Sequence, residues 1–365
     1  MIRKYLPKNT EEMIHWYERY ISPMALVVGF LLDNFIFLNR IDSLQSYALI
    51  TSYLVIAALA IAALNVIEEG RVSSPLILKV APFIPVVMQF SFGGLFSAFL
   101  ALYARSASVL VSWVFVIVVA LLLLSNERFR RRYVQLPFQV GIYFIALFSF
   151  LIFLLPILFA RIGPMMFLLS GAASIAIIAG LLSVLRRIIP QTFAKERTRI
   201  ARTIAVLFLV FNVLYFSNAI PPLPLALKEG GIYHAVVREG FQYVIQAETQ
   251  PWYREMLPIP ARVHLVRGSS LFAYTAVFAP TGLSTRLLHE WQYDDPVEGW
   301  STRSTVGFVI SGGTDRGFRG YSVKFAPEEG RWRVNVLTPS RQIIGRLQFE
   351  IVYVSEEVET KRLIR

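Results

Sequence analysis

Hydrophobic residues are concentrated in the first 220 positions, where they form seven long runs. The runs occupy residues 22–39, 46–66, 81–104, 107–125, 136–160, 165–185 and 203–220. A bilayer core of about 30 Å is crossed by roughly 20 helical residues. Apart from Asp33, no acidic or basic residue falls inside these runs. The pattern predicts an integral membrane domain of seven transmembrane helices over residues 22–220, preceded by a cytoplasmic or interfacial segment, residues 1–21.

After Ile220 the hydrophobic period changes from helical to two. Pro221, Pro222 and Pro224 end the last run, because proline cannot continue the helical hydrogen bonds. Apolar and polar side chains then alternate, most clearly over residues 321–325, 331–336 and 346–353. One apolar and one polar face per strand is typical of a half-buried antiparallel sheet.

Turn residues separate the predicted strands. Pro327 and Gly330 bound one turn, and Thr338 to Arg341 form the next. Further strands are expected near residues 233–247, 261–266, 270–278, 283–293 and 303–310. Seven or eight short strands predict a separate all-β domain over residues 221–365, with the fold of an Ig-like β-sandwich.

Composition narrows the class of protein further. Of the 365 residues, 55% are hydrophobic and 16% are charged, where about 25% is usual, and none is cysteine. The mean hydropathy is +0.55. These values exclude an ordinary cytoplasmic enzyme, a disordered chain, a disulfide scaffold and a cysteine-based metal or redox centre.

The positive charge follows a membrane pattern and not a nucleic-acid one. Residues 1–220 hold 19 Lys and Arg against 9 Asp and Glu, in clusters between the apolar runs. Alternate connections carry 16 and 3 basic residues, and the richer side is expected to be cytoplasmic. The N-terminus is therefore predicted to lie in the cytoplasm. Seven crossings place the β domain in the periplasm or outside the cell, on a bacterial inner (plasma) membrane.

Four short segments of the β domain carry a family resemblance. They are residues 289–293, 312–322, 330–334 and 344–349. They resemble the C-terminal domain of unknown function 2914, which typically closes bacterial polytopic membrane proteins. The resemblance is specific over residues 285–352 and weaker over 204–284. It implies an architecture and no mechanism. Where a family position reads Gly-Gly-Arg, this chain has Gly312, Gly313 and Thr314.

Asp33 and Asn34 are the polar candidates inside the membrane. An ionisable residue in a bilayer core is costly, and by default it indicates a function such as carrying a proton or a cation. The alternative is that both side chains hydrogen-bond to polar groups of other helices. We find neither paired intramembrane acids nor an internal repeat, both of which would favour a transporter.

The best binding candidate of the β domain is the stretch from Ser311 to Tyr321. Its glycines let backbone N–H groups approach an anion, and Arg316 and Arg319 could clamp a carboxylate or phosphate. The alternative is a hairpin loop with solvated arginines. Tyr321, at the end of this stretch, is a further ligand-binding candidate. His289 and Trp291 share one strand face with Tyr293 by alternation, and this face either lines a ligand surface or belongs to the core.

The remaining sequence shows no catalytic or cofactor motif. The four histidines form no close pair, and no hydrolase, zinc-protease or phosphate-loop motif occurs. We therefore expect no metal, no cofactor and no catalytic residue. The sequence favours a non-enzymatic, membrane-anchored recognition or scaffold module that contacts the lipid bilayer and binds an envelope glycan or an envelope protein, and no nucleic acid. The alternative is a transporter or membrane-embedded enzyme using Asp33, with the β domain as lid or sensor.

Overall fold

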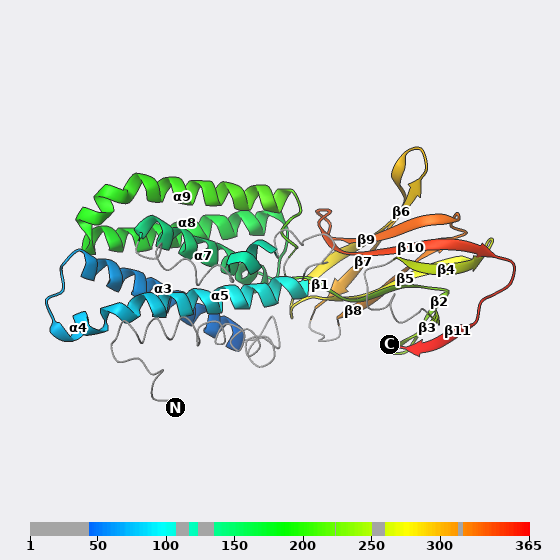
Figure 1. Cartoon of the computed structure of the whole chain (residues 1–365). Helices are drawn as coiled ribbons and strands as arrows, with labels where there is room; N and C mark the ends of the chain where they lie inside the picture. Colours follow the sequence, from blue (N-terminus) through cyan, green and yellow to red (C-terminus); the bar gives the residue numbers. More distant parts are fainter. Residues whose placement is uncertain (1–43, 107–116, 123–134, 223, 250–259, 313–316) are drawn as a thin grey trace, which may run out of the picture. The chain divides into compact units, whose positions relative to one another are not determined.

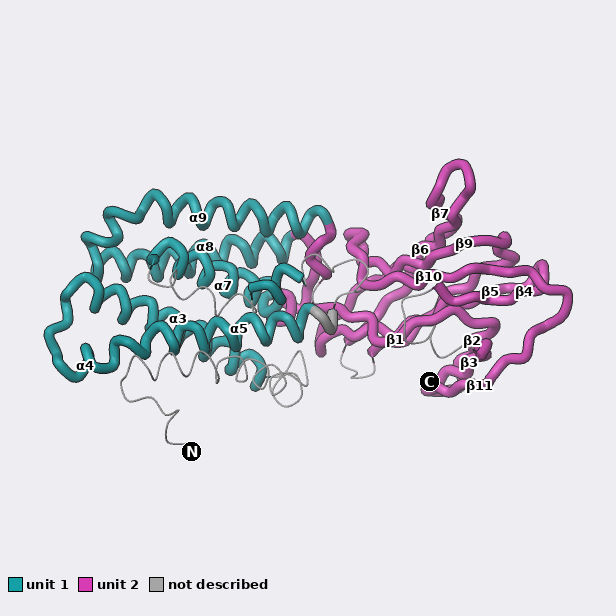
Figure 2. Tube along the Cα trace, in the orientation of Figure 1, with its two compact units in different colours: residues 1–105, 114–155, 165–217 teal, residues 106–113, 156–164, 218–365 magenta. Residues whose placement is uncertain are grey.

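The protein divides into a helical unit and a β unit. The computed structural model describes residues 44–106, 117–122, 135–222, 224–249, 260–312 and 317–365. The helical unit comprises residues 1–105, 114–155 and 165–217, and the β unit comprises residues 106–113, 156–164 and 218–365 (Figure 2). Each unit is described here by itself.

Five helical segments of the described residues are long and apolar enough to cross a membrane (Figure 1). They are α3 (Leu44–Glu68), the segment Pro75–Tyr103, α7 (Leu136–Leu158), α8 (Pro164–Ile188) and α9 (Pro190–Phe216). The second segment is formed by α4 (Pro75–Val80), the 3₁₀ turn η4 (Ala81–Phe83) and most of α5 (Ile84–Ser106). These segments indicate a multi-pass membrane protein in contact with lipid.

Among the described residues the number of spans is five, and not the seven that the sequence predicted for the chain. The predicted span 22–39 lies outside the described residues, and of the span 107–125 only residues 117–122 are described. Asp33, Asn34 and the N-terminal segment 1–21 also lie outside that part of the chain.

The basic segment 186–202 is helical, although the sequence suggested a loop there. α8 continues to Ile188, and α9 begins at Pro190. Proline is favoured at a first helical position, and Lys, Arg and Glu are good helix formers. In addition, the Glu69 carboxylate accepts the backbone N–H groups of Gln191 (3.4 Å) and Thr192 (3.3 Å). It thereby satisfies donors that the first turn of α9 would otherwise leave open.

Aromatic side chains pack the interior of the helical unit. The ring of Phe148 on α7 lies 4.6 Å from that of Phe211 and 5.9 Å from that of Phe208, both on α9. Gly171 on α8 permits this approach, since a Cβ atom there would lie 2.9 Å from Phe208. A buried polar bond also joins two helices, from Asn65 Nδ2 on α3 to Gln139 Oε1 on α7 at 2.6 Å.

The β unit contains eleven strands in the described residues, arranged in three sheets. The strands are β1 (Ala226–Tyr233), β2 (Ala235–Glu239), β3 (Gln242–Glu248), β4 (Ala261–Val266), β5 (Ser270–Phe278), β6 (Ser284–Asp295), β7 (Gly299–Ser311), β8 (Phe318–Phe325), β9 (Gly330–Leu337), β10 (Ile343–Val354) and β11 (Thr360–Ile364). The sheet orders are β4-β10-β9-β6-β7, β1-β5-β8 and β11-β3-β2. All pairs are antiparallel except β4 with β10, which is parallel.

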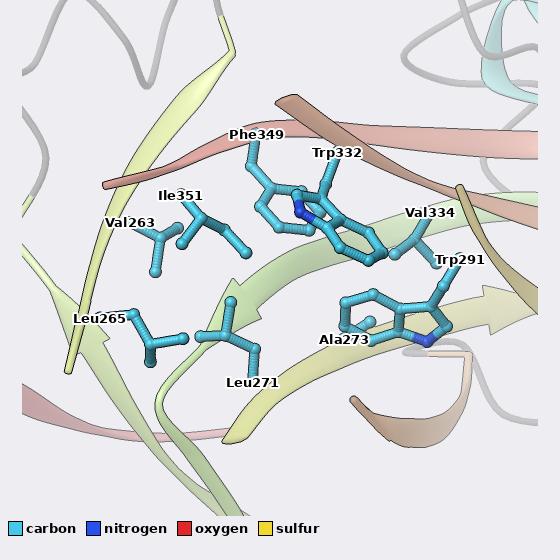
Figure 3. Close-up of a cluster of buried hydrophobic side chains, with 9 residues drawn as sticks. All are labelled: Val263, Leu265, Leu271, Ala273, Trp291, Trp332, Val334, Phe349 and Ile351. Carbon is cyan, nitrogen blue, oxygen red and sulfur yellow. The ribbon is translucent and has the colours of Figure 1, made fainter. Parts of the chain in front are cut away.

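The five-stranded sheet and the β1-β5-β8 sheet form a sandwich with a shared core (Figure 3). The largest cluster joins both sheets and consists of Val263, Leu265, Leu271, Ala273, Trp291, Trp332, Val334, Phe349 and Ile351. The Trp291 ring meets those of Trp332 and Phe349 edge to face, with centroids 6.5 and 6.1 Å apart. Edge-to-face contacts add to the stability gained from burying aromatic area.

The β unit departs from the sequence expectation in strand number and direction. The expected strand 233–247 divides into β2 and β3 at Gly240, whose φ of +62° suits glycine. β1 and β11 were not expected, because neither segment alternates regularly. The β4–β10 pair is parallel where an antiparallel sheet was expected. Period-two alternation says nothing about strand direction, which depends on distant connections.

Candidate anion-binding site on the five-stranded sheet

Polar side chains cover the face of the five-stranded sheet that points away from the core. Register places Glu290 opposite Asn335 and Gln292 opposite Arg333, between β6 and β9. Arg346 of β10 is the other neighbour of Asn335. Since residues directly opposite each other share a sheet face, these five side chains lie together. We call this group the outer-face cluster.

Glu290 is the buried acid of the outer-face cluster. Its side chain is only 5% exposed, and a buried carboxylate requires hydrogen-bond donors. Its Oε2 accepts from Asn335 Nδ2 at 3.1 Å and from Gln292 Nε2 at 3.0 Å. Its Oε1 accepts a short hydrogen bond from the Arg341 guanidinium and one from Thr302 Oγ1 at 3.4 Å. The acid is therefore fully engaged within the protein.

Arg341 reaches Glu290 from the hairpin turn between β9 and β10. Its backbone has a φ of +63°, unusual for a residue other than glycine. The turn holds it through a hydrogen bond from its N–H to the Thr338 carbonyl at 2.9 Å. Thr338 Oγ1 also accepts the N–H of Gln342 at 3.1 Å. The predicted turn is confirmed, and its geometry directs an arginine onto the sheet face.

Arg333 and Arg346 are held by neutral amide groups. Arg333 Nε donates to Gln292 Oε1, and Arg346 Nε donates to Asn335 Oδ1, both at 2.7 Å. Within the described residues, neither guanidinium lies within 4 Å of a carboxylate. Two other arginines of this face, Arg262 and Arg331, are paired with Glu350 and Asp294.

Both guanidiniums lie in surroundings that disfavour their positive charge, as expected for cations without a carboxylate in contact. Burial and then the positive charge of Arg346 lower the pKa of Arg333, and burial lowers the pKa of Arg346. An arginine stays protonated despite such shifts. The negative charge of Glu290 on both arginines, and of Asp294 on Arg333, partly offsets these shifts, although neither carboxylate lies within 4 Å of them. Two fixed, partly desolvated cations without a carboxylate in direct contact can bind an anion at little cost in ordering, because their Nε atoms are already anchored.

Trp300 of β7 adds an aromatic surface beside the cations. The Arg333 guanidinium carbon lies 4.2 Å from the centroid of the Trp300 ring. Trp300 is 37% exposed, so part of its ring remains available to a ligand. Thr302, on the same strand, also donates to Glu290. The site thus combines two cations, amide side chains and an indole on one sheet face.

His289 and Trp291, two of the residues predicted from the sequence, lie in the interior. Both are fully buried. His289 Nε2 and Nδ1 share hydrogen bonds of 2.9 Å with the hydroxyls of Thr275 and Ser322. Trp291 Nε1 donates to the same Ser322 Oγ at 3.0 Å. Burial lowers the pKa of His289 to about 4, so its ring is neutral near pH 7. Neither side chain offers a surface to a ligand here.

The other predicted residues are separate from the outer-face cluster. Arg319 and Tyr321 lie on β8, in the other sheet of the sandwich. The Arg319 guanidinium donates to the Phe241 carbonyl at 3.4 Å, and Tyr321 is 38% exposed. Arg316 lies outside the described residues. Gly312 is tightly packed, since a Cβ atom there would collide with the Pro280 carbonyl.

Two of the histidines meet around one carboxylate. Glu248 accepts from His234 Nε2 at 2.7 Å, from His264 Nδ1 at 2.9 Å and from the His264 backbone N–H at 2.7 Å. Although burial opposes it, these hydrogen bonds lower the pKa of Glu248. No group of three or more His, Asp or Glu in the described residues has the geometry of a metal site.

Sequence reasoning missed Arg333, Arg341 and Arg346 as site residues. The alternation in 331–336 and 346–353 put Arg333 and Arg346 on polar faces. Their adjacency depends on the β9–β10 register, which pairs Arg346 with Asn335 and Gln348 with Arg333. The sequence did contain one indication of the site, because several arginines occupy polar positions of two alternating segments joined by a predicted turn.

The apolar helices and the sheets together define the class of protein, a multi-pass membrane protein with a C-terminal β-sandwich. Residues 284–351 match the family model described as protein of unknown function (DUF2914), which confirms the resemblance found in the sequence. The match contains the whole outer-face cluster, together with Trp300 and Arg341. No curated protein matches the chain.

Two solved structures show weak similarity. One is an immunoglobulin-like protein from Pseudomonas aeruginosa, at 14% identity and a TM-score of 0.21, covering 36% of this chain and 98% of that chain. The other is an alkylpurine DNA glycosylase of Pseudomonas fluorescens bound to DNA, at 13% identity and a TM-score of 0.21, covering 79% and 80%. A TM-score of 0.21 is too low to indicate a shared fold or function.

Proposed function

We propose that the protein is a membrane-anchored recognition module that binds an acidic envelope glycan on the outer face of the five-stranded sheet. The observation that carries the proposal is the pair Arg333 and Arg346, whose guanidiniums are fixed by amides and lack a carboxylate partner among the described residues. Arginine recognises carboxylates through paired N–H donors. The exposed part of Trp300 suits the apolar face of a sugar ring, and the amides suit its hydroxyls.

We infer an Ig-like sandwich with one insertion for the β unit. The sheet β1-β5-β8 corresponds in order to Ig strands A, B and E. The chain β10-β9-β6-β7 corresponds to G, F, C and C′, as in variable-type domains. Trp291 then occupies the position of the buried tryptophan on strand C. β2 and β3 are the insertion, and no disulfide joins the sheets because the chain lacks cysteine.

The predicted topology agrees with this function. A cytoplasmic N-terminus and an odd number of crossings would carry residues 221–365 to the periplasm or cell exterior, where envelope glycans are found. The helical domain, residues 22–220, would then anchor the recognition module, and no catalytic step is required of it.

The test uses the full-length protein in lipid nanodiscs. Oligogalacturonate and oligomannuronate serve as acidic probes, and their carboxyl-reduced forms serve as neutral controls. We expect acidic oligosaccharides alone to bind, and Arg333→Gln with Arg346→Gln to weaken binding at least about tenfold, which corresponds to 1.4 kcal/mol.

The matched control is Arg262→Gln on the same sheet face, because Arg262 is already paired with Glu350 at 3.0 Å. It should bind like the wild type. Equal binding of neutral and acidic sugars, or capture of an envelope protein and no glycan by the same two arginines, would contradict the proposal.

A further inference from the structure

A pocket of about 540 Å³ lies at one end of the helical unit. Its lining includes Asn65 and Glu68 at the end of α3, Gln135 before α7, and three residues from the first half of α9, namely Glu196, Arg199 and Arg202. The pocket therefore lies where α3 ends and α7 begins, beside the basic first half of α9. It belongs entirely to the helical unit.

One lining residue of the pocket, Asn65, is held by buried polar contacts. Asn65 Nδ2 donates to Gln139 Oε1 at 2.6 Å and also to the Ile61 carbonyl at 2.8 Å. Both Asn65 and Gln139 are buried. Satisfied buried amides hold neighbouring helices in one arrangement, so the polar end of the pocket is preformed.

The pocket carries charges of both signs. Glu196 and Arg199 form an exposed i,i+3 pair at 3.3 Å, which water weakens. Glu68 and Arg202 are not within 4 Å of any opposite charge in the described part of the chain. Nearby Glu69 is engaged, since it pairs with Arg71 at 3.4 Å and accepts N–H groups of α9. The pocket therefore offers a ligand one carboxylate, that of Glu68, and one guanidinium, that of Arg202, neither of which is paired with an opposite charge among the described residues.

The position of the pocket identifies the kind of ligand. α3 and α7, of 25 and 23 residues, are long enough to span a bilayer core, so the end of α3 and the start of α7 lie at the depth of the lipid headgroups. Arg199 and Arg202 on α9 directly precede its apolar run, which begins near residue 203. Leu136 and Pro137 give the pocket an apolar wall, which suits the start of an acyl chain. A headgroup that fits both Arg202 and Glu68 contains an anionic group, which is the phosphate in a phospholipid, and a cationic hydrogen-bond donor.

We propose that this pocket binds a phospholipid with a phosphoethanolamine headgroup. Arg202, with Arg199, takes the phosphate by charge-assisted hydrogen bonds, and Glu68 takes the primary ammonium. A choline headgroup has no N–H to donate, and a glycerol headgroup has no positive charge. The site is separate from the outer-face cluster and does not depend on the glycan proposal.

The test is native mass spectrometry of the full-length protein in detergent, after delipidation. Equal amounts of short-chain phosphatidylethanolamine, phosphatidylcholine and phosphatidylglycerol are offered together. We expect one phosphatidylethanolamine to be retained in preference to the other two, by about tenfold or more. Arg202→Gln and Glu68→Gln should each remove this preference. Arg197→Gln, on the same helix but outside the lining, is the matched control and should keep it.

Two further experiments test whether the site recognises the whole phosphoethanolamine headgroup or a phosphate alone. Soluble phosphoethanolamine and inorganic phosphate are titrated as competitors, and only the former should compete, at far higher concentration than the lipid. Glu68→Asp should restore part of the preference lost in Glu68→Gln. Equal retention of all three lipids, unchanged retention by both Gln variants, or competition by inorganic phosphate alone would overturn the proposal.

Discussion

The two faces of the five-stranded sheet use polar residues in opposite ways. On the inner face, His289 and Trp291 direct every polar atom to the hydroxyls of Thr275 and Ser322. On the outer face, Arg333 and Arg346 use one N–H group each for an amide of the protein, and their other N–H groups have no hydrogen-bond partner among the described residues. Polar atoms that all hydrogen-bond within the protein are typical of a core. Cations that are held in place but keep some N–H donors without a protein partner are typical of a binding surface. Along β6, His289 and Trp291 face the core, whereas Glu290 and Gln292 belong to the outer-face cluster.

The largest effect should come from the inner face, through Trp291→Ala. Removing a fully buried indole leaves a cavity in the shared core of the sandwich, which should cost about 3–5 kcal/mol of stability. Hydrogen–deuterium exchange of the full-length protein would report it as faster exchange in β6, β9 and β10.

The matched control is Trp300→Ala on the outer face. Trp300 is partly exposed and contacts Arg333, so we expect a loss of stability below about 1 kcal/mol. Acidic-glycan binding should weaken. If the two tryptophan variants exchanged equally fast, the distinction between the faces would be wrong.

His289 should make the inner face sensitive to acid. Its pKa is about 4 in the folded protein against an ordinary value of 6.5, so the unfolded state binds more protons between these values. Stability is then complete above about pH 6.5 and falls as the pH drops toward 4, by about 3 kcal/mol.

The measurement is the unfolding temperature of the β unit in the full-length protein between pH 7.5 and 4.5. His289→Gln should flatten the profile, because the titrating group is gone. An equally steep profile in this variant would assign the acid sensitivity to other groups, with the Glu248 cluster as the first candidate.

Glu290→Gln should separate stability from binding on the outer face. The substitution removes a buried acceptor of hydrogen bonds from Arg341, Asn335 and Gln292, which should cost about 1–3 kcal/mol. It also removes the negative charge nearest to Arg333 and Arg346, so the folded variant should bind acidic glycans more tightly.

Both quantities can be read from one sample, by thermal unfolding with and without oligogalacturonate. Glu350→Gln is the control, since its pair with Arg262 is exposed and should contribute less than about 1 kcal/mol. If Glu290→Gln bound more weakly at a temperature where it remains folded, the ligand would contact Glu290 as well as the two arginines.

The smallest effect on stability should come from Arg333→Gln with Arg346→Gln. Each side chain loses one hydrogen bond to an amide, but the mutual repulsion that contributes to the lowered pKa of Arg333 is relieved. We expect a net change within about 1 kcal/mol, measured by thermal unfolding. A large loss of stability would make the two arginines structural.

Local patterns were sufficient for much of the architecture. The apolar runs predicted all five described spans, because a bilayer requires long uninterrupted hydrophobic helices. Period-two alternation located β9 and β10, and the turn at Thr338 separates them as expected. The division of 233–247 into two strands was missed, since a single glycine, Gly240, marks it.

The candidate site could not be assembled from the sequence in the same way. The prediction singled out Arg316 and Arg319 because glycines surround them, yet Arg319 lies on β8 and contacts the Phe241 carbonyl. Arg333 and Arg346 are 13 positions apart and come together through the register of β9 with β10. Register and burial are tertiary properties, and they also decide that His289 faces the core.

We infer that Arg333 and Arg346 form an anion site and contribute little to stability. The most direct measurement is the affinity of full-length wild-type and Arg333→Gln/Arg346→Gln protein for oligogalacturonate, at low and physiological salt. We expect binding by the wild type that weakens with salt, and a loss of at least about tenfold in the double variant at unchanged unfolding temperature. Equal affinity of the two proteins, or a loss only in step with unfolding, would show that the two arginines do not form an anion site.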